Sequence, residues 1–318
     1  MKLGMVFPGQ GSQSVGMLAQ LHASESCVRT TFEEASNALA FDLGKLMLEG
    51  PELDLNRTYN TQPAVLTGAV AMWRVWCARG GPRPALLAGH SVGEFAALVC
   101  AEALPFAEAV SFVAERGRYM QEAVPEGEGA VAAILGLDDG AVAAVCEEAA
   151  QGEVVCAVNY NAPGQVVIAG HTAAVERALQ GAKEAGAKKA MMLPVSVPVH
   201  CELMRAPGER LLPSIDALNL SAPQIPIIHN VDVKTHVTVD EIRAVLRPHV
   251  FSPVHWARTV QHMAEAGVGN MIESGAGRVL SGLAKRISRS IATHPIFDDA
   301  SVDKALAALG SAAKGAMP

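Results

Sequence analysis

The sequence has few charged residues and no excess of basic ones. Only 18% of its 318 residues are charged, and 25 lysines and arginines against 32 aspartates and glutamates give a net charge of −7. Proteins that bind nucleic acid need a basic surface to neutralise phosphates, so this balance argues against nucleic acid as a partner. Half of the residues are hydrophobic. That proportion excludes a disordered chain and indicates a packed, enzyme-like protein of about two domains.

Long apolar segments and paired cysteines are also missing. Arg74 interrupts the apolar run that begins at Pro63, and the uncharged stretch 154–175 contains Asn, Pro, Gly and Gln. Neither segment predicts a membrane-spanning helix, and the short apolar run before Pro8 is not long enough for a signal peptide. The six cysteines include no C-x-x-C pair, which argues against a zinc site or a disulfide framework. We therefore expect a soluble, cytoplasmic protein with no membrane contact, no metal and no cofactor.

Short apolar runs alternate with helical patterns and predict an α/β fold. Residues 3–7 and 85–89 are apolar throughout, as expected of strands buried on both faces. Residues 27–48 and 60–78 have apolar positions at three- and four-residue intervals, and each is predicted to form one helix.

The pattern changes at about residue 128. The next 65 or so residues follow the order strand, helix, strand, strand, helix, strand (βαββαβ), which is typical of a ferredoxin-like domain. The sequence therefore predicts a small ferredoxin-like domain at 128–195, inserted into a large α/β domain formed by 1–127 and 196–318.

The segment Gly89–Gly93 matches the G-x-S-x-G nucleophile elbow and lies between a predicted strand and a predicted helix. The two glycines permit a sharp turn that exposes the hydroxyl of Ser91. The following helix directs its N–H groups toward that hydroxyl, and the N–H of Val92 is placed to face a developing oxyanion. Ser91 is therefore the predicted nucleophile, with a plain tight turn as the alternative.

A serine nucleophile requires a base, and the residues alone leave the choice among ten histidines open. His200 is a candidate because it follows the small domain, where the chain re-enters the large one. His90 adjoins the nucleophile and is expected to point away from it. The spacing of the three histidines between 249 and 262 fits no metal-ligand motif. The helix dipole accounts for Glu94 in a first helical turn, so a Ser–His dyad and a triad with a hidden acid both stay open.

The loop at 9–13 and Arg116 are two further candidates for the site. The loop 9–13 lacks the phosphate-binding motifs and fits better as a second N–H donor in an acyl-transfer site. Arg116 lies on an otherwise apolar helix and, taken alone, is expected to be a surface arginine with a packed aliphatic stem.

Five segments together resemble bacterial malonyl-CoA:acyl carrier protein transacylases. They are FPGQGSQ at 7–13, GHSVGE at 89–94, ERGRYMQEAVPEG at 115–127, PVSVPVHCELM at 194–204 and GAGRVLSGLAKRI at 275–287. The resemblance implies an α/β-hydrolase-like parallel-sheet core with the ferredoxin-like insertion. It also implies transfer of malonyl from malonyl-CoA to the phosphopantetheine thiol of holo acyl carrier protein, through a malonyl-serine intermediate, for fatty acid synthesis.

The resemblance also implies roles for individual residues. Ser91 is the acylated nucleophile and His200 is its base. The backbone N–H groups of Gln10 and Val92 form the oxyanion hole. Arg116 binds the free carboxylate of the malonyl group.

Three further assignments depend on the same resemblance. A main-chain carbonyl at His249, where relatives usually carry Gln or Asn, is expected to orient the base. Val199, where relatives often have Ser or Phe, is expected to line the acyl pocket and leaves the acyl preference open. The acidic carrier needs a basic surface on this acidic chain, and the candidates on one C-terminal helix are Arg278, Lys285, Arg286 and Arg289. An ordinary solvated helix face is the alternative.

Other functions remain possible at this point. A malonyl transferase of polyketide assembly or of malonate decarboxylation would carry the same residues. A serine thioesterase is disfavoured by Arg116, and a non-catalytic carrier-binding module by the joint presence of the nucleophile, base and arginine. One site per chain requires no partner subunit, so we expect a monomer.

Overall fold

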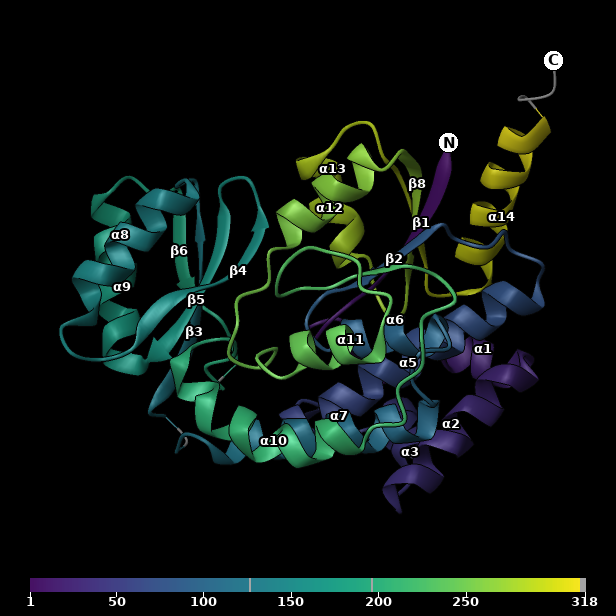
Figure 1. Ribbon diagram of the computed structural model, residues 1–318, viewed down its shortest axis with the longest axis horizontal. Coiled ribbons are helices and arrows are strands. Elements are labelled where there is room, and N and C mark those ends of the chain that lie inside the picture. The colour runs from purple at the N-terminus through teal and green to yellow at the C-terminus, as the bar shows by residue number, and fades with distance from the viewer. Residues whose placement is uncertain (126, 196, 315–318) are drawn as a thin grey trace.

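The structure, a computed structural model, describes residues 1–125, 127–195 and 197–314 (Figure 1). It contains one five-stranded and one four-stranded sheet, each covered by helices. None of the helices in these described ranges is long and apolar enough to cross a membrane.

The five-stranded sheet is parallel throughout. Its strand order is β7-β2-β1-β8-β9. The strands are β1 (Lys2–Phe7), β2 (Leu86–Gly89), β7 (Ile227–Ile228), β8 (Val268–Ser274) and β9 (Ala292–Ile296). The apolar runs at 3–7 and 85–89 thus form adjacent strands at the centre of the sheet. The predicted α/β class with a parallel-sheet core is confirmed.

Helices cover both faces of this sheet because successive side chains on a strand point to opposite faces. Met5 and Phe7 of β1 pack into the larger core, whereas Val6 packs with residues of α12 and α13 on the other side. The helices of this part of the chain are α1 (Ala19–Ser24), α2 (Ser26–Leu39), α3 (Leu43–Glu49), α4 (Glu52–Leu55), α5 (Thr58–Ala78), α6 (Gly93–Cys100), α7 (Phe106–Glu122), α10 (Arg205–Ala217), α11 (Val239–Leu246), α12 (Trp256–Glu265), α13 (Val279–Ile287) and α14 (Asp299–Lys314), with a 3-10 turn at Glu202–Met204.

The single helix predicted over 27–48 is wrong. Helix α2 ends before Ala40, which adopts a left-handed conformation with φ of 57°. A new helix then starts after Asp42, whose side chain accepts a hydrogen bond from the backbone N–H of Lys45. A short acidic side chain in this position stabilises a helix start. The apolar spacing therefore runs across two separate helices, with a break at residues 40–42.

The four-stranded sheet is antiparallel, in the order β4-β5-β3-β6. Its elements are β3 (Gly129–Leu135), α8 (Asp139–Ala150), β4 (Val155–Ala162), β5 (Gln165–His171), α9 (Thr172–Glu184) and β6 (Lys189–Met192). This is the βαββαβ order expected of a ferredoxin-like unit, and both helices pack over its core. Residue 196, where the large domain is predicted to resume, lies outside the described residues, so the division at 128 and 195 stays a prediction.

Strand β4 also forms hydrogen bonds to a segment outside its own sheet. The backbone N–H of Tyr160 donates to the carbonyl of Val254, and the N–H of Val254 donates to Val158, at 2.9 and 2.8 Å. These bonds place β4 beside the segment that leads into α12. The carboxyl ends of β1 and β2, where parallel sheets usually bind ligands, face a cavity that β4 also lines.

Candidate active site

A sharp turn between β2 and α6 carries Ser91. The serine has a left-handed backbone, with φ of 51°. A Cβ at Gly89 would overlap the backbone of Gly93, and one at Gly93 would overlap the carbonyl of Phe7. Only glycine fits at either position, so the G-x-S-x-G spacing follows from close backbone contact. The turn leaves the Ser91 side chain facing a cavity.

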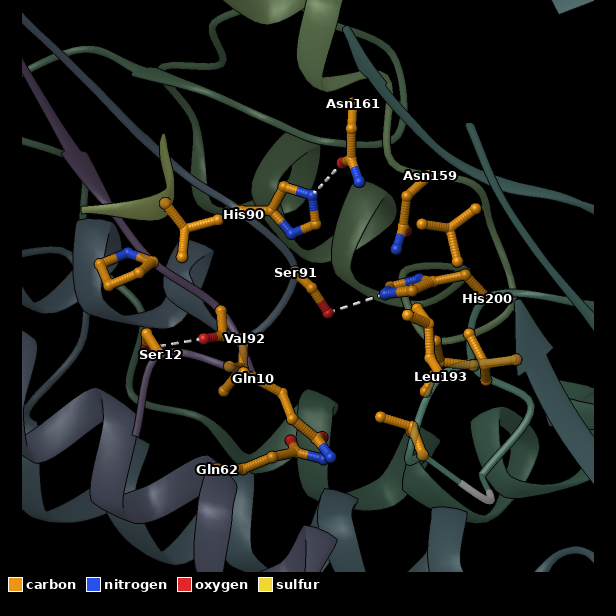
Figure 2. Close-up of a pocket in the computed structure, with 18 of the residues that line it drawn as sticks. Gln10, Ser12, Gln62, His90, Ser91, Val92, Asn159, Asn161, Leu193 and His200 are labelled. Carbon is orange, nitrogen blue, oxygen red and sulfur yellow. Dashed lines mark hydrogen bonds between the residues drawn. The ribbon is translucent and has the colours of Figure 1, made fainter. Parts of the chain in front are cut away.

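The hydroxyl of Ser91 lies next to the imidazole of His200 (Figure 2). Ser91 Oγ is 2.7 Å from His200 Nε2. On the other side of the ring, His200 Nδ1 lies 2.9 Å from the carbonyl of Ser252 and 3.2 Å from that of His249. Because carbonyls only accept, the ring proton resides on Nδ1, and Nε2 is free to accept the proton of Ser91.

The environment keeps His200 uncharged. Its side chain is buried at 2% exposure. Burial lowers the pKa of His200 well below the usual 6.5, and the nearby Arg116, His249 and His90 act in the same direction. A neutral imidazole at neutral pH can act as a general base.

The cavity beside this pair has a volume of about 220 Å³. The loop at 8–12, the elbow, β4, α13 and residues on either side of position 196, from Leu193 and Val195 to Val199 and His200, line it; several of them are labelled in Figure 2. Apolar side chains, Val199 among them, form much of its wall, with a few polar groups between them. This composition is typical of a small-molecule site.

Two residues that line the cavity with Ser91, Gln10 and Val92, have backbone N–H groups without an acceptor among the described residues. Val92 is also the residue before the first turn of α6, where backbone N–H groups carry a partial positive charge. The pair could therefore stabilise a negative oxygen formed beside Ser91.

Arg116 brings a positive charge to the same cavity. It is 2% exposed, so the surface position suggested by its helix pattern alone is wrong. Its Nη1 donates to Gln62 Oε1 at 2.5 Å, while Nη2 has no partner among the described residues. Burial lowers the pKa of Arg116 to about 10, against the opposing effect of Glu94, so the group stays charged at neutral pH.

The ring of His90 contacts Trp256 and Asn161. Its ring lies 5.4 Å from that of Trp256, which fits a packing residue. However, it also lines the cavity, and its Nε2 is 2.8 Å from Asn161 Oδ1 on β4 (Figure 2). His90 thus joins the elbow to the four-stranded sheet.

The four basic residues near the C-terminus do not share one helix. Only Lys285 and Arg286 lie within α13, since Arg278 precedes its first turn and Arg289 follows its end. All four are exposed, but Arg286 donates to Gln165 of β5. Arg278 and Lys285 line a separate hollow of about 490 Å³. Lys304, a basic side chain that sequence reasoning missed, also lines it. So do the acidic Asp298 and His294, and burial and Lys304 lower the pKa of His294 below the usual 6.5.

Several polar residues of the site were not found from the sequence. Gln62, Asn159, Asn161 and Ser252 lie within or beside the cavity but come from three different segments, α5, β4 and the chain before α12. No local motif marks them. A fifth, Asn230, is the second residue after the end of β7, and its place near the carboxyl end of a parallel strand was the available signal.

Comparisons with known proteins agree on one family. The model of a family described as "Acyl transferase domain" matches residues 5–296. The chain is 51% identical to the malonyl CoA-acyl carrier protein transacylase of Escherichia coli over 305 residues, which cover 96% of this chain and 99% of the relative. It is 40% identical to the Bacillus subtilis protein of the same name over 309 residues, covering 97% of each.

Solved structures are equally similar. An acyl carrier protein S-malonyltransferase from Vibrio cholerae has a TM-score of 0.93 and 51% identity, covering 96% of this chain and 99% of that one. A malonyl-transacylase in complex with the acyl carrier protein of a type II PKS has a TM-score of 0.95 and 48% identity, covering 97% and 100%.

Proposed function

Since the chain belongs to the acyl transferase family of malonyl CoA-acyl carrier protein transacylases, we propose that it transfers malonyl from malonyl-CoA to the phosphopantetheine thiol of acyl carrier protein. The observation that carries the chemistry is the hydrogen bond between Ser91 Oγ and a neutral, buried His200 beside an unpaired cation. Such an arrangement suits acyl transfer to and from serine, for an acyl group that bears a carboxylate.

In the first half-reaction, Ser91 Oγ attacks the thioester carbonyl of malonyl-CoA while His200 Nε2 takes its proton. The resulting oxyanion accepts hydrogen bonds from the N–H groups of Gln10 and Val92, each worth about 3 kcal/mol of barrier. Collapse of the intermediate breaks the C–S bond, and His200 returns the proton to the departing thiolate. The product is a malonyl ester on Ser91.

The second half-reaction runs through the same groups in reverse. The carrier's thiol gives its proton to His200 and attacks the ester carbonyl. The same two N–H groups bind the oxyanion. When the C–O bond breaks, Ser91 recovers its proton from His200, and malonyl leaves as the carrier's thioester.

Arg116 would select the malonyl group. Its free Nη2 can donate to the substrate carboxylate, and a charge-assisted bond of this kind contributes about 1.5–3 kcal/mol. That energy favours malonyl over acetyl by about tenfold to a hundredfold. Val199, which lines the cavity next to the base, would limit the size of the acyl group.

The carrier would dock beside α13. Val279 and Leu280 line the cavity, and the basic hollow of Arg278, Lys285 and Lys304, which Asp298 also lines, lies at the same helix. An acidic carrier bound there would be positioned to send its phosphopantetheine arm into the cavity. We include Arg286 and Arg289 as flanking charges.

We place the enzyme in fatty acid synthesis and in the cytoplasm, as a monomer divided into domains at residues 128 and 195. Its six unpaired cysteines fit a reducing compartment, and the groups named above all come from one chain. Service to polyketide assembly is the second candidate, because one similar structure is bound to the carrier of a type II PKS.

A transfer assay tests the proposal. The protein is mixed with malonyl-CoA and either holo acyl carrier protein or the apo form, which lacks the thiol. Malonyl-carrier formed only with the holo protein supports it. Release of free malonate at the same rate with both forms would instead indicate a thioesterase.

A further inference from the structure

Glu94 is a fully buried carboxylate next to the site. It lies in the first turn of α6 with no exposed surface, and it does not line the cavity. Burial opposes its charge, but His249 and His229 outweigh that effect and hold the pKa of Glu94 well below its usual range. Glu94 is therefore a fixed negative charge among His229, His249 and Arg116.

One side of this carboxylate connects to the nucleophile. Glu94 Oε2 accepts a hydrogen bond from the backbone N–H of Asn230 at 2.8 Å. The Asn230 side chain in turn accepts from the N–H of Ser91 at 2.8 Å and donates to the carbonyl of Gly89 at 2.6 Å. Asn230 thus binds the elbow on both sides of His90, where the backbone of Ser91 is left-handed. The orientation of Ser91 Oγ depends on this clamp.

The other connection runs to the base. Glu94 Oε2 lies 3.4 Å from His249 Nε2, and Glu94 Oε1 lies 2.7 Å from His229 Nδ1. The carbonyl of His249 is one of the two that face His200 Nδ1. The next carbonyl, of Val250, accepts from the backbone N–H of His200 at 3.1 Å. His249 Nε2 has no hydrogen-bond partner in the described part of the chain, so Glu94 acts on this ring through its charge, at the residue whose carbonyl faces the base.

We propose that Glu94 is a positioning residue for the transfer reaction, because its carboxylate fixes the elbow through Asn230 and the backbone beneath His200 through His249. It contacts neither the reacting atoms nor the cavity. The inference rests on the proposed function, since it concerns the rate at which Ser91 is acylated. A displacement of about 1 Å in such a site can reduce a rate by about 100-fold.

The test is Glu94→Gln, with the rate of malonyl-serine formation followed by rapid quench at saturating malonyl-CoA. We expect a rate constant about 10- to 100-fold lower. The KM for malonyl-CoA should stay within about threefold, since Arg116 and the cavity wall are unchanged. A purely structural role would reduce the fraction of enzyme that can be acylated, without slowing the rest.

Glu273→Gln is the matched control. Glu273 is equally buried on β8, but its carboxylate accepts from the backbone N–H groups of Leu280 and Ser281 instead. We expect the acylation rate constant of Glu273→Gln to stay within about threefold of wild type. This should hold even if Glu94→Gln and Glu273→Gln both have a lower unfolding temperature than the wild type.

Asn230→Ala tests the proposal if Glu94→Gln does not fold. It removes the two side-chain hydrogen bonds from Asn230 to the elbow and leaves the Glu94 carboxylate in place. It should also slow acylation by about tenfold or more.

A double variant gives a further test. The effects of Glu94→Gln and His249→Gln on the acylation rate constant should be non-additive, as expected of coupled residues. Wild-type rate constants in both Glu94→Gln and Asn230→Ala, or equal slowing in Glu273→Gln, would overturn the inference. A wild-type enzyme that never forms the adduct would overturn the proposed function instead.

Discussion

Gln62 and Arg116 share one short hydrogen bond, from Nη1 of the arginine to Oε1 of the glutamine, at the wall of the cavity. The glutamine holds the guanidinium in place without neutralising it, because an amide carries no charge. The second terminal nitrogen, Nη2, has no partner in the described part of the chain. A buried cation that is oriented but unpaired is suited to receive a carboxylate.

Loss of this cation should remove the preference for malonyl. In Arg116→Ala we expect the ratio of kcat/KM for malonyl-CoA to that for acetyl-CoA to fall by about tenfold to a hundredfold. Steady-state assays with both substrates measure it. Arg118→Ala, on the same helix with a side chain 57% exposed, is the control and should leave the ratio unchanged. An unchanged ratio in Arg116→Ala would remove Arg116 from this role.

Loss of the base should slow acylation without weakening substrate binding. We expect His200→Ala to lower the rate constant for malonyl-serine formation by about 100- to 10,000-fold, the usual contribution of general base catalysis. Rapid-quench measurement at saturating malonyl-CoA gives this value. A decrease of less than about tenfold would contradict the assignment of His200.

The pH dependence of acylation follows from the direction of the His200 shift. Burial lowers the pKa of His200 below 6.5, and the neutral form is the base. Acylation should therefore stay constant as the pH falls through 6.5 and decline only at lower pH. Rate constants measured between about pH 5 and about pH 8 test this. A midpoint at or above 6.5 would show that the imidazole is not held neutral as described.

The basic hollow beside α13 should affect the carrier and not malonyl-CoA. Lys285→Glu combined with Lys304→Glu reverses two of its charges and is expected to raise the KM for holo acyl carrier protein about tenfold. The KM for malonyl-CoA should not change. Lys45→Glu on α3 is an exposed control outside this hollow. Equal KM values for the carrier in all three proteins would contradict docking at this surface.

Local sequence patterns predicted the parts of the fold that local physics determines. The elbow could be recognised because Gly89 and Gly93 are required by contacts within a few residues and with β1. The βαββαβ order could be recognised because each element has its own periodicity. The break at Ala40 was missed because apolar spacing continues across it.

Properties set by distant contacts were not visible in the sequence. Whether Arg116 is buried depends on α5, which brings Gln62 beside it from 54 residues away. Glu94 looked like a helix-start acid, and its actual partners come from positions 229, 230 and 249. The basic residues near 278–289 could not be assigned to one surface until the ends of α13 were known.

The central claim is that Ser91 carries the malonyl group between the two thiols, and intact-mass spectrometry tests it most directly. Wild-type protein and Ser91→Ala are mixed with malonyl-CoA, and holo acyl carrier protein is then added. We predict a malonyl adduct on the wild type alone, discharged onto the carrier when the carrier is added. An adduct of equal amount on Ser91→Ala, or a wild-type adduct that the carrier does not remove, would contradict the claim.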